Sequence, residues 1–454
     1  MSESVTSLRV SDPGIRALLT QDSQWQTWLD VEVALAHAEA ELGMIPQQAA
    51  QAIERAARLE LLDRDRMLVD LTKTGHALVP LIWELSRICE GDAGHYVHWG
   101  ATTQNILDSS EMILLRRANR IYLDLLADIL EALADLAERT RAMAAPGRTH
   151  GQHAVPITFG FKVAGWIDEL ARDADRLIAA EREQLFVVML GGAAGTFASF
   201  GGQGIELQHR FAKQLGMQAM AVPSRAIQDR FGDYSCRLAL LSATCGRIGG
   251  EIFQLMKQEF GEAREPVPAG TVGSSTMPQK RNPILAQDLL TGAADIRTSL
   301  PLALEAMQID HEANRAHTQM MRRATHNICS VMGDMLARVL LMARGLTLDE
   351  QRMRQNLDLT GGLILAEALM LELGRHIGRQ EAHDVVYEIS EAAFGPGASF
   401  SELLAADPRI TQHMTTEQID TLLDPSLYTG ECAILADQQV QVARDKAQEI
   451  RNGA

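Results

Sequence analysis

The chain has 454 residues, of which 46% are hydrophobic, and its formal net charge is −17 at pH 7. This acidity argues against nucleic acid and anionic membrane surfaces as partners, because both are bound through basic patches. The length predicts about two to four domains.

The cysteines do not form a pattern typical of disulfides or metal sites. They are odd in number, and none is in a CxxC pair: Cys89, Cys236, Cys245, Cys329 and Cys432. A reducing compartment is therefore favoured, and a zinc site is not expected. The first residues lack the basic and apolar regions of a secretory signal, and no run of about 18 apolar residues occurs. We therefore expect a cytoplasmic protein.

Helical periodicity dominates the chain. Between Ile106 and Ala145 there is neither proline nor glycine, and apolar residues recur at three- and four-residue steps: Leu114, Ala118, Ile121, Leu125, Ile129, Ala132 and Leu136. This pattern predicts one long helix. Residues 238–260 and 308–344 predict further long helices, and Pro301 is expected to kink or break the helix that begins after Pro283. No segment predicts a convincing sheet, so the fold class is all-α.

Two zones rich in helix breakers divide the chain. The first is Gly91 to Thr103, and the second lies around Thr347 to Asn356. They predict an N-terminal helical domain (1–104), a central long-helix bundle (105–350) and a C-terminal helical domain (351–454). The glycine-rich segments that begin at Gly191 and Gly201 lack the preceding strand and the lysine of a nucleotide loop, so they favour a hinge or a close backbone approach.

The most informative segment runs from Gly273 to Pro283, Gly-Ser-Ser-Thr-Met-Pro-Gln-Lys-Arg-Asn-Pro. Gly273 and Pro278 disfavour a helix interior, so the segment is expected to form a loop. It offers hydroxyls, backbone N–H groups and a cation together, which suits a site where negative charge develops on a substrate.

Three other segments contain candidate site residues. Thr102 and Thr103 precede the long helix, where hydroxyls and free backbone amides can form a binding site for a carboxylate. His150 lies in Gly147-Arg148-Thr149-His150-Gly151-Gln152-His153-Ala154, and His76 lies in Lys73-Thr74-Gly75-His76-Ala77. Each histidine can exchange protons near neutral pH. Taken alone, each of these histidines is more typical of a structural residue. For the threonines, simple helix capping is favoured as much as carboxylate binding.

Together the four segments resemble, in order and spacing, the signature regions of the fumarase/aspartase superfamily. Residues 24–32 are similar to the start of adenylosuccinate lyases. Residues 356–363 and 422–428 are closest to 3-carboxy-cis,cis-muconate cycloisomerases. The resemblance implies three all-α domains and a homotetramer with a twenty-helix core, in which three subunits build each active site. It implies no cofactor and no metal.

The resemblance also implies a role for each matching residue. Ser274 would be the general base, His150 would protonate the leaving group, and His76 would share that task or bind the substrate. The small anionic dicarboxylate substrate would be bound by Thr102, Thr103, Thr149, Lys280, Asn282, Arg9, Gln152 and Arg322.

Four positions depart from the patterns of the two branches. Gln287 and Ala313 stand where adenylosuccinate lyases have a glutamate and an arginine, and Gln279 stands where both branches have histidine. The register around Gln228 differs as well. We expect β-elimination from a substituted succinate, with release of fumarate or an analogue. C–N cleavage is favoured because His76 and His150 are both present. Adenylosuccinate lyase, the muconate cycloisomerase and a non-catalytic structural tetramer remain as alternatives.

Overall fold

The computed structural model describes residues 10–183, 185–267, 276–277, 279–393 and 399–453, and these are largely helical, as predicted. The chain divides into two compact units. Unit 1 comprises residues 1–125, 173–243 and 291–337, and unit 2 comprises residues 126–172, 244–290 and 338–454. The division into three domains stays a prediction.

Five long helices contribute residues to both units: α6 (Thr103–Thr140), α7 (Phe159–Arg182), α9 (Asp229–Leu255), α10 (Ile284–Glu305) and α11 (Arg315–Gly345). The helix expected from Ile106 to Ala145 corresponds to α6, which begins at Thr103 and ends at Thr140. Pro301 was expected to kink or break α10, but the helix extends past it to Glu305. Near a helix end, the missing proline N–H removes a single hydrogen bond that few later residues depend on.

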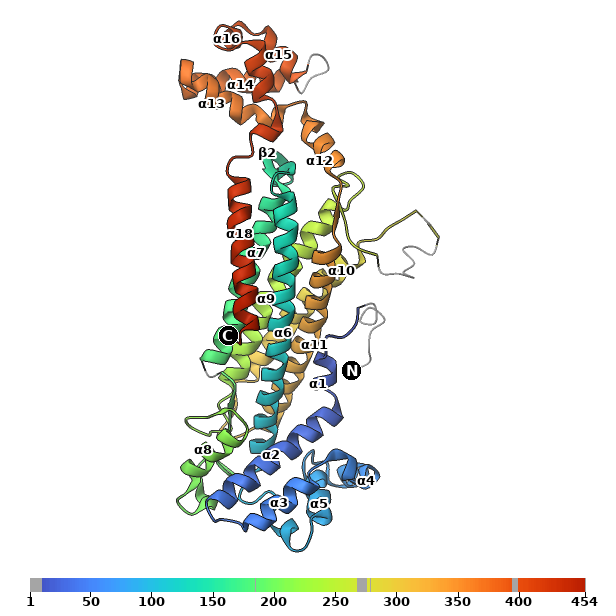
Figure 1. Cartoon of the computed structure of the whole chain (residues 1–454), viewed down its shortest axis with the longest axis vertical. Helices are drawn as coiled ribbons and strands as arrows, with labels where there is room; N and C mark the ends of the chain where they lie inside the picture. The colour runs from blue at the N-terminus through green and yellow to red at the C-terminus, as the bar shows by residue number, and fades with distance from the viewer. Residues whose placement is uncertain (1–9, 184, 268–275, 278, 394–398, 454) are drawn as a thin grey trace. The chain divides into compact units, whose positions relative to one another are not determined.

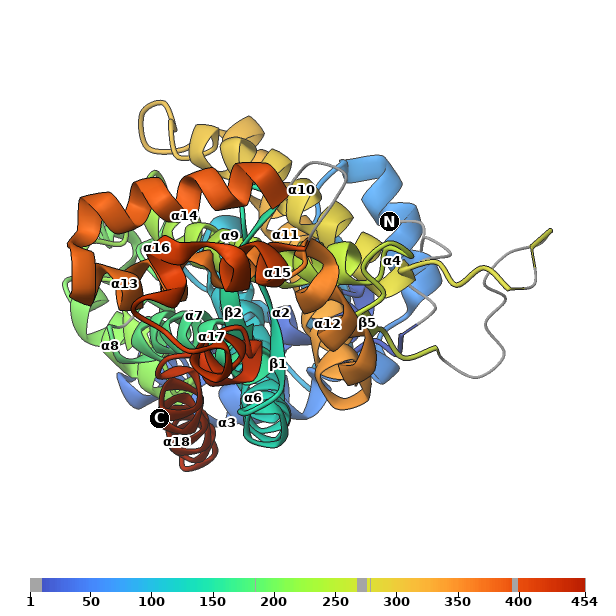
Figure 2. The same ribbon diagram turned by 90° about the horizontal axis from the view of Figure 1, so that it is seen from above.

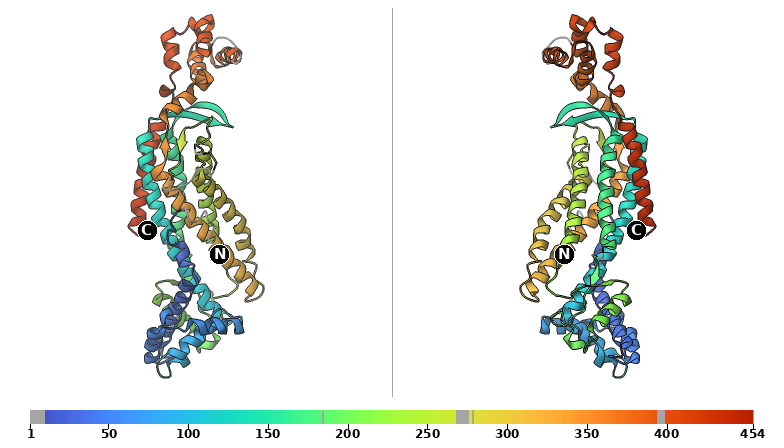
Figure 3. Two further views of the ribbon diagram at one scale, coloured as in Figure 1. Left: turned by 90° about the vertical axis from the view of Figure 1, so that its right-hand side faces the viewer. Right: turned by 90° about the vertical axis from the view of Figure 1, so that its left-hand side faces the viewer.

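The expectation of no sheet is wrong at three short pairs. Strand β1 (Ala144–Thr149) pairs antiparallel with β2 (Gln152–Thr158), and the hairpin is visible as the paired teal arrows in Figure 3. Strand β3 (Val187–Val188) pairs with β4 (Gln218–Ala219), and β5 (Ala263–Arg264) pairs with β6 (Thr347–Leu348). The hairpin places Pro146 opposite Pro156. Prolines are depleted in strands, so they concealed this strand pattern.

Unit 1 contains the N-terminal helices α1 (Ile15–Leu18), α2 (Gln21–Glu41), α3 (Gln47–Ala56), α4 (Arg64–Thr74) and α5 (Val79–Ile88), together with α8 (Gly204–Gln214). Helix α2 packs against α3 and α8, and α4 packs against α5 (Figure 1). The buried Tyr122 hydroxyl of α6 donates a hydrogen bond to the Cys329 carbonyl of α11 at 2.7 Å, which ties these two helices together.

Unit 2 contains α12 (Glu350–Leu357), α13 (Ala366–Ile377), α14 (Arg379–Ala393), α15 (Phe400–Ala406), α16 (Pro408–Thr411), α17 (Thr416–Leu422) and α18 (Cys432–Arg451). Helices α13 to α17 enclose a small apolar core around Leu369, Phe400 and Ile419, and α13 to α16 lie together in Figure 2. Arg451 of α18 forms an ion pair with Asp128 of α6 at 3.1 Å. In the described part of the chain, no helix is long and apolar enough to cross a membrane.

Candidate functional site

The predicted site residues fall into two groups. Unit 1 holds His76, Thr102, Thr103 and Arg322, and unit 2 holds Thr149, His150, Gln152, Lys280 and Asn282. Ser274 and Arg9 lie outside the described residues.

The structure brings His76 to the start of α6. Its Nε2 lies 3.5 Å from the Thr103 hydroxyl, and its Nδ1 accepts a long hydrogen bond from the Val79 N–H at 3.4 Å. With Nδ1 as the acceptor, the neutral ring carries its proton on Nε2. His76 therefore presents an N–H donor beside the threonine pair, which suits binding of a carboxylate.

The loop before Thr102 is anchored by a buried glutamate. His98 has a left-handed backbone (φ 62), and its Nδ1 lies 2.7 Å from Oε1 of Glu32 on α2. Burial opposes the charge on His98, but the neighbouring Glu32 carboxylate raises the pKa of the imidazole. A left-handed conformation is uncommon for histidine and is maintained by surrounding contacts. The pair thus fixes where the loop enters the helix.

Arg322 lies beside a buried carboxylate on α6. Its Nε is 3.7 Å from Oε2 of Glu111, whose other oxygen is 2.7 Å from His326 Nε2. Burial opposes the charge of Glu111, but His326 and Arg322 together hold the pKa of this carboxyl below its usual range. Arg322 is only partly buried, so its guanidinium can meet a ligand while Glu111 orients it.

His150 occupies the tight turn of the β1–β2 hairpin. Thr149 pairs with Gln152, so His150 and Gly151 form a two-residue loop, with φ values of 53 and 76. Positive φ at both positions defines a type I′ turn, which favours Asn-Gly. The side chains of Thr149, His150 and Gln152 are exposed around this turn. The strained conformation of His150 is typical of a functional position.

An ion pair between the partly buried Arg148 and the buried Glu262 lies next to this turn. Arg148 donates two hydrogen bonds to Glu262, one of them at 3.1 Å, and its guanidinium stacks 4.7 Å from the Phe260 ring centre. Asn356 of α12 donates to the same carboxylate at 2.6 Å. Because Arg148 directly precedes Thr149, this cluster fixes the position of the turn.

Lys280 and Asn282 precede α10 in unit 2. Lys280 is exposed, and Asn282 is half-buried. The sequence analysis did not identify Glu265, whose buried carboxylate accepts the N–H groups of Leu285 at 2.9 Å and Ala286 at 3.0 Å. Burial raises the pKa of Glu265, although these backbone donors lower it. No local sequence signal marks this role, because Glu265 lies 20 positions before Leu285 in the chain.

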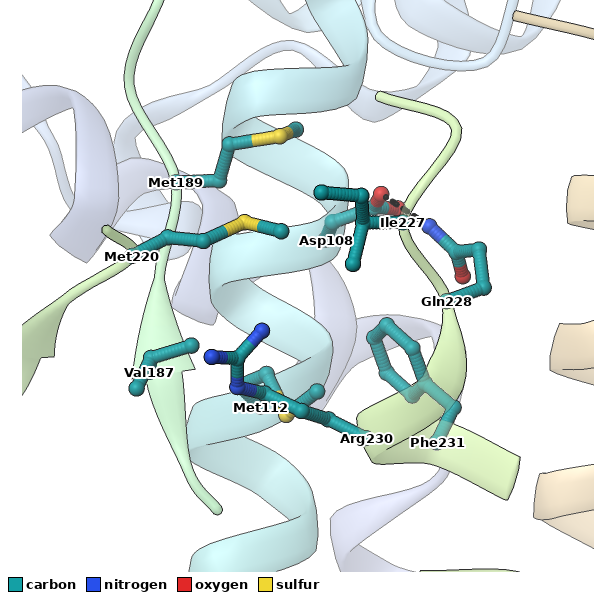
Figure 4. Close-up of a pocket in the computed structure, with 9 residues that line it drawn as sticks. All are labelled: Asp108, Met112, Val187, Met189, Met220, Ile227, Gln228, Arg230 and Phe231. Atoms are coloured by element: carbon teal, nitrogen blue, oxygen red, sulfur yellow. Dashed lines mark hydrogen bonds between the residues drawn. The ribbon is translucent and has the colours of Figure 1, made fainter. Parts of the chain in front are cut away.

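Unit 1 also contains a small pocket, shown in Figure 4, which the sequence did not predict. Asp108 stands at one side and accepts a hydrogen bond from the Gln228 amide at 3.1 Å, while Arg230 stands at another. Burial raises the pKa of Asp108. The remaining lining residues are apolar: Met112, Val187, Met189, Met220, Ile227 and Phe231. Gln228 therefore has a structural partner here.

A family model described as lyase matches residues 7–297, and one described as adenylosuccinate lyase C-terminus matches residues 362–439. The N-acetyl-S-(2-succino)cysteine lyase of Dickeya dadantii is 37% identical, covering 95% of this chain and 94% of the relative. The adenylosuccinate lyase of Methanothermobacter thermautotrophicus is 36% identical, covering 95% and 97%. The solved 3-carboxy-cis,cis-muconate lactonizing enzyme from Pseudomonas putida has a TM-score of 0.91 at 30% identity, covering 99% of this chain and 100% of that structure.

Proposed function

Because the chain belongs to the fumarase/aspartase superfamily of lyases, we propose that it eliminates the substituent of a substituted succinate and releases fumarate. The observation that carries this proposal is the threonine pair at the start of α6, where His76 adds an N–H donor 3.5 Å from Thr103. Helix N-termini with such donors suit carboxylates.

Ser274 removes a proton from Cβ, beside one carboxylate of the substrate. The electron pair of the broken C–H bond passes first into that carboxylate, which becomes doubly negative. Lys280 and Asn282 stabilise this charge. The pair then forms the Cα–Cβ double bond as the bond to the substituent breaks, and His150 protonates a substituent that is too basic to leave as an anion. Thr102 and Thr103 hold the other carboxylate throughout.

The leaving group that we favour is a thiol. Relatives from Dickeya dadantii and Enterococcus italicus, 37% and 35% identical to this chain, are named N-acetyl-S-(2-succino)cysteine lyases. A thiol has a pKa of about 8.5, so it leaves as a thiolate with little help from an acid. His76 lies at the threonine pair, Thr102 and Thr103, so His150 is left as the acid. Gln287 carries a neutral amide, which cannot raise the basicity of His150 as a carboxylate would.

C–N cleavage is the second candidate, because an amine leaving group requires a proton donor and His150 is exposed in its turn. Ala313 disfavours adenylosuccinate as the amine adduct, since an arginine contact to a phosphate or carboxylate is absent there. We also propose a homotetramer in which segments of three subunits complete each site, and sedimentation would measure its mass.

The test follows the ultraviolet absorbance of fumarate with N-acetyl-S-(2-succino)cysteine, adenylosuccinate and other N-substituted aspartates, and follows 3-carboxy-cis,cis-muconate separately. We expect kcat/KM of at least about 10⁴ M⁻¹s⁻¹ for the thioether and much less for the others. Turnover of carboxymuconate alone would establish the cycloisomerase instead. Inactivity on every compound would favour the structural tetramer.

A further inference from the structure

We propose that Asn105 is a positioning residue that holds the backbone of Thr102, and with it the Thr102 hydroxyl, in place for the substrate carboxylate. This inference rests on the proposed function, because it concerns the threonine pair assigned above. Asn105 is fully buried on the first turn of α6.

The Asn105 side chain fixes the backbone of Thr102. Thr102 directly precedes α6, and at that position a threonine hydroxyl usually accepts an N–H from the first turn. Here the Asn105 Oδ1 accepts the Thr102 N–H at 3.1 Å, which is the return contact of a capping box and holds the Thr102 backbone in place. Among the described residues, the Thr102 hydroxyl has no hydrogen-bonding partner. It is therefore free to bind a ligand.

The same oxygen ties the helix start to the glycine-rich segment. Asn105 Oδ1 also accepts the Gly192 N–H at 3.1 Å, and Gly192 has φ 74. A Cβ at Gly192 would lie 3.1 Å from Ser199 Oγ, and Ser199 donates its hydroxyl to the Gly100 carbonyl at 2.8 Å. The glycines thus allow the close backbone approach that locks the Gly100–Thr102 turn.

The two N–H donors fix the orientation of the Asn105 amide, because only its oxygen can accept them. As a result, the Asn105 Nδ2 is buried without a partner among the described residues. A buried donor without a partner is rare and costly, and such groups are kept where another demand outweighs the cost. Here the other demand is that Oδ1 must accept both the Thr102 N–H and the Gly192 N–H.

The experiment compares Asn105→Ala, Thr102→Val and the double variant with the wild type. Without Oδ1, the Thr102 and Gly192 N–H groups lose their shared acceptor, and the Thr102 hydroxyl is no longer held where it meets the carboxylate. Because this carboxylate is bound alike in the ground and transition states, KM should rise about tenfold or more while kcat changes less than about threefold. The double variant should be no worse than Thr102→Val alone, since Asn105 acts through Thr102.

Asn119→Ala is the matched control, because Asn119 is a fully buried asparagine on the same helix that hydrogen-bonds the Leu177 carbonyl at 3.2 Å. It should lower the melting temperature as Asn105→Ala does, yet leave KM unchanged. Additive effects of Thr102→Val and Asn105→Ala, or an equal KM change in Asn119→Ala, would overturn the inference.

Calorimetric binding of succinate, which cannot react, separates this inference from the proposed function. If the wild type binds succinate but turns over no adduct, the proposed function fails, and tenfold weaker binding by Asn105→Ala still supports the inference. If the wild type turns over adducts and Asn105→Ala matches it in KM and in succinate affinity, only the inference fails. A wild type that binds no succinate contradicts both.

Discussion

The carboxylate of Glu265 accepts a hydrogen bond from the backbone N–H of Leu285 at 2.9 Å, although the two residues are 20 positions apart in the chain. A second hydrogen bond, from Ala286 at 3.0 Å, makes Glu265 the acceptor for the start of α10. The segment between them contains Ser274, Lys280 and Asn282. One buried carboxylate therefore joins the two ends of the segment that carries the proposed base.

Glu265→Ala should release these ends. Because two charge-assisted hydrogen bonds are lost, we expect kcat/KM to fall about ten- to a hundredfold and the Leu285 and Ala286 amides to exchange hydrogen faster. Hydrogen exchange with mass spectrometry and steady-state kinetics would measure both effects. Glu259→Ala, at an exposed glutamate before β5, is the control and should change neither. Unaltered exchange at α10 in Glu265→Ala would contradict this role.

Ser274→Ala should reduce turnover of the preferred succinate by about 10²–10⁴-fold, the usual contribution of a positioned base. The fumarate absorbance assay measures the rate. Ser275→Ala changes the neighbouring serine in the same way and should lose less than about tenfold. An equal loss in the two variants, or full activity in Ser274→Ala, would show that another group takes the proton.

His150→Asn tests the identity of the leaving group. Asparagine is favoured in the left-handed turn that His150 occupies, so the hairpin should remain folded. A thiolate leaves with little protonation, and we expect less than about a tenfold loss on a thioether substrate. An amine requires the acid, so the loss there should reach about 10²–10⁴-fold. Parallel kinetics on the two adducts would decide, and equal losses would refute the role of His150 as the acid.

Arg148→Lys should destabilise unit 2, because a lysine cannot replace the paired hydrogen bonds to the buried Glu262. Losing a hydrogen bond to a buried carboxylate costs about 1.5–3 kcal/mol of unfolding free energy, which chemical denaturation would measure. Arg141→Lys is the control. Its ion pair with Asp437, at 3.1 Å, is exposed and should contribute less than about 1 kcal/mol. A similar small change in both variants would show that the Arg148 pair does not hold the hairpin.

Glu39 should make stability depend on pH. Its side chain is fully buried, neither oxygen has a partner among the described residues, and burial together with the Glu32 charge raises its pKa from 4.5 to about 9. Because the folded-state pKa lies above the unfolded value, the stabilising contribution is complete below pH 4.5 and is lost as the pH rises towards 9.

The glutamine in Glu39→Gln cannot titrate. As the pH rises across this window, the unfolding free energy of the variant should therefore increase relative to that of the wild type, by up to about 1.4 kcal/mol per pH unit. Denaturation curves at several pH values would measure the difference. Glu41→Gln changes an exposed residue of the same region and should follow the wild type. A constant difference between Glu39→Gln and the wild type from pH 5 to 9 would contradict the shift.

The sequence by itself determined the all-α class, the family and the presence of the long helix α6, because long apolar periodicity and a distinctive loop are local signals. The sequence did not indicate the β1–β2 hairpin, because prolines hid the strands. His150 therefore lies in a type I′ turn between two strands and not in a link between two helices.

Only the tertiary structure decided which residues support the site. Glu32, Glu262 and Glu265 act through partners 66, 114 and 20 positions away, and no spacing in the sequence indicates such contacts. Asn105 combines the return contact of a helix cap, which is local, with the N–H of Gly192, which is 87 positions away. Buried polar groups must find partners wherever folding brings them, and that pairing is set by packing of the whole chain.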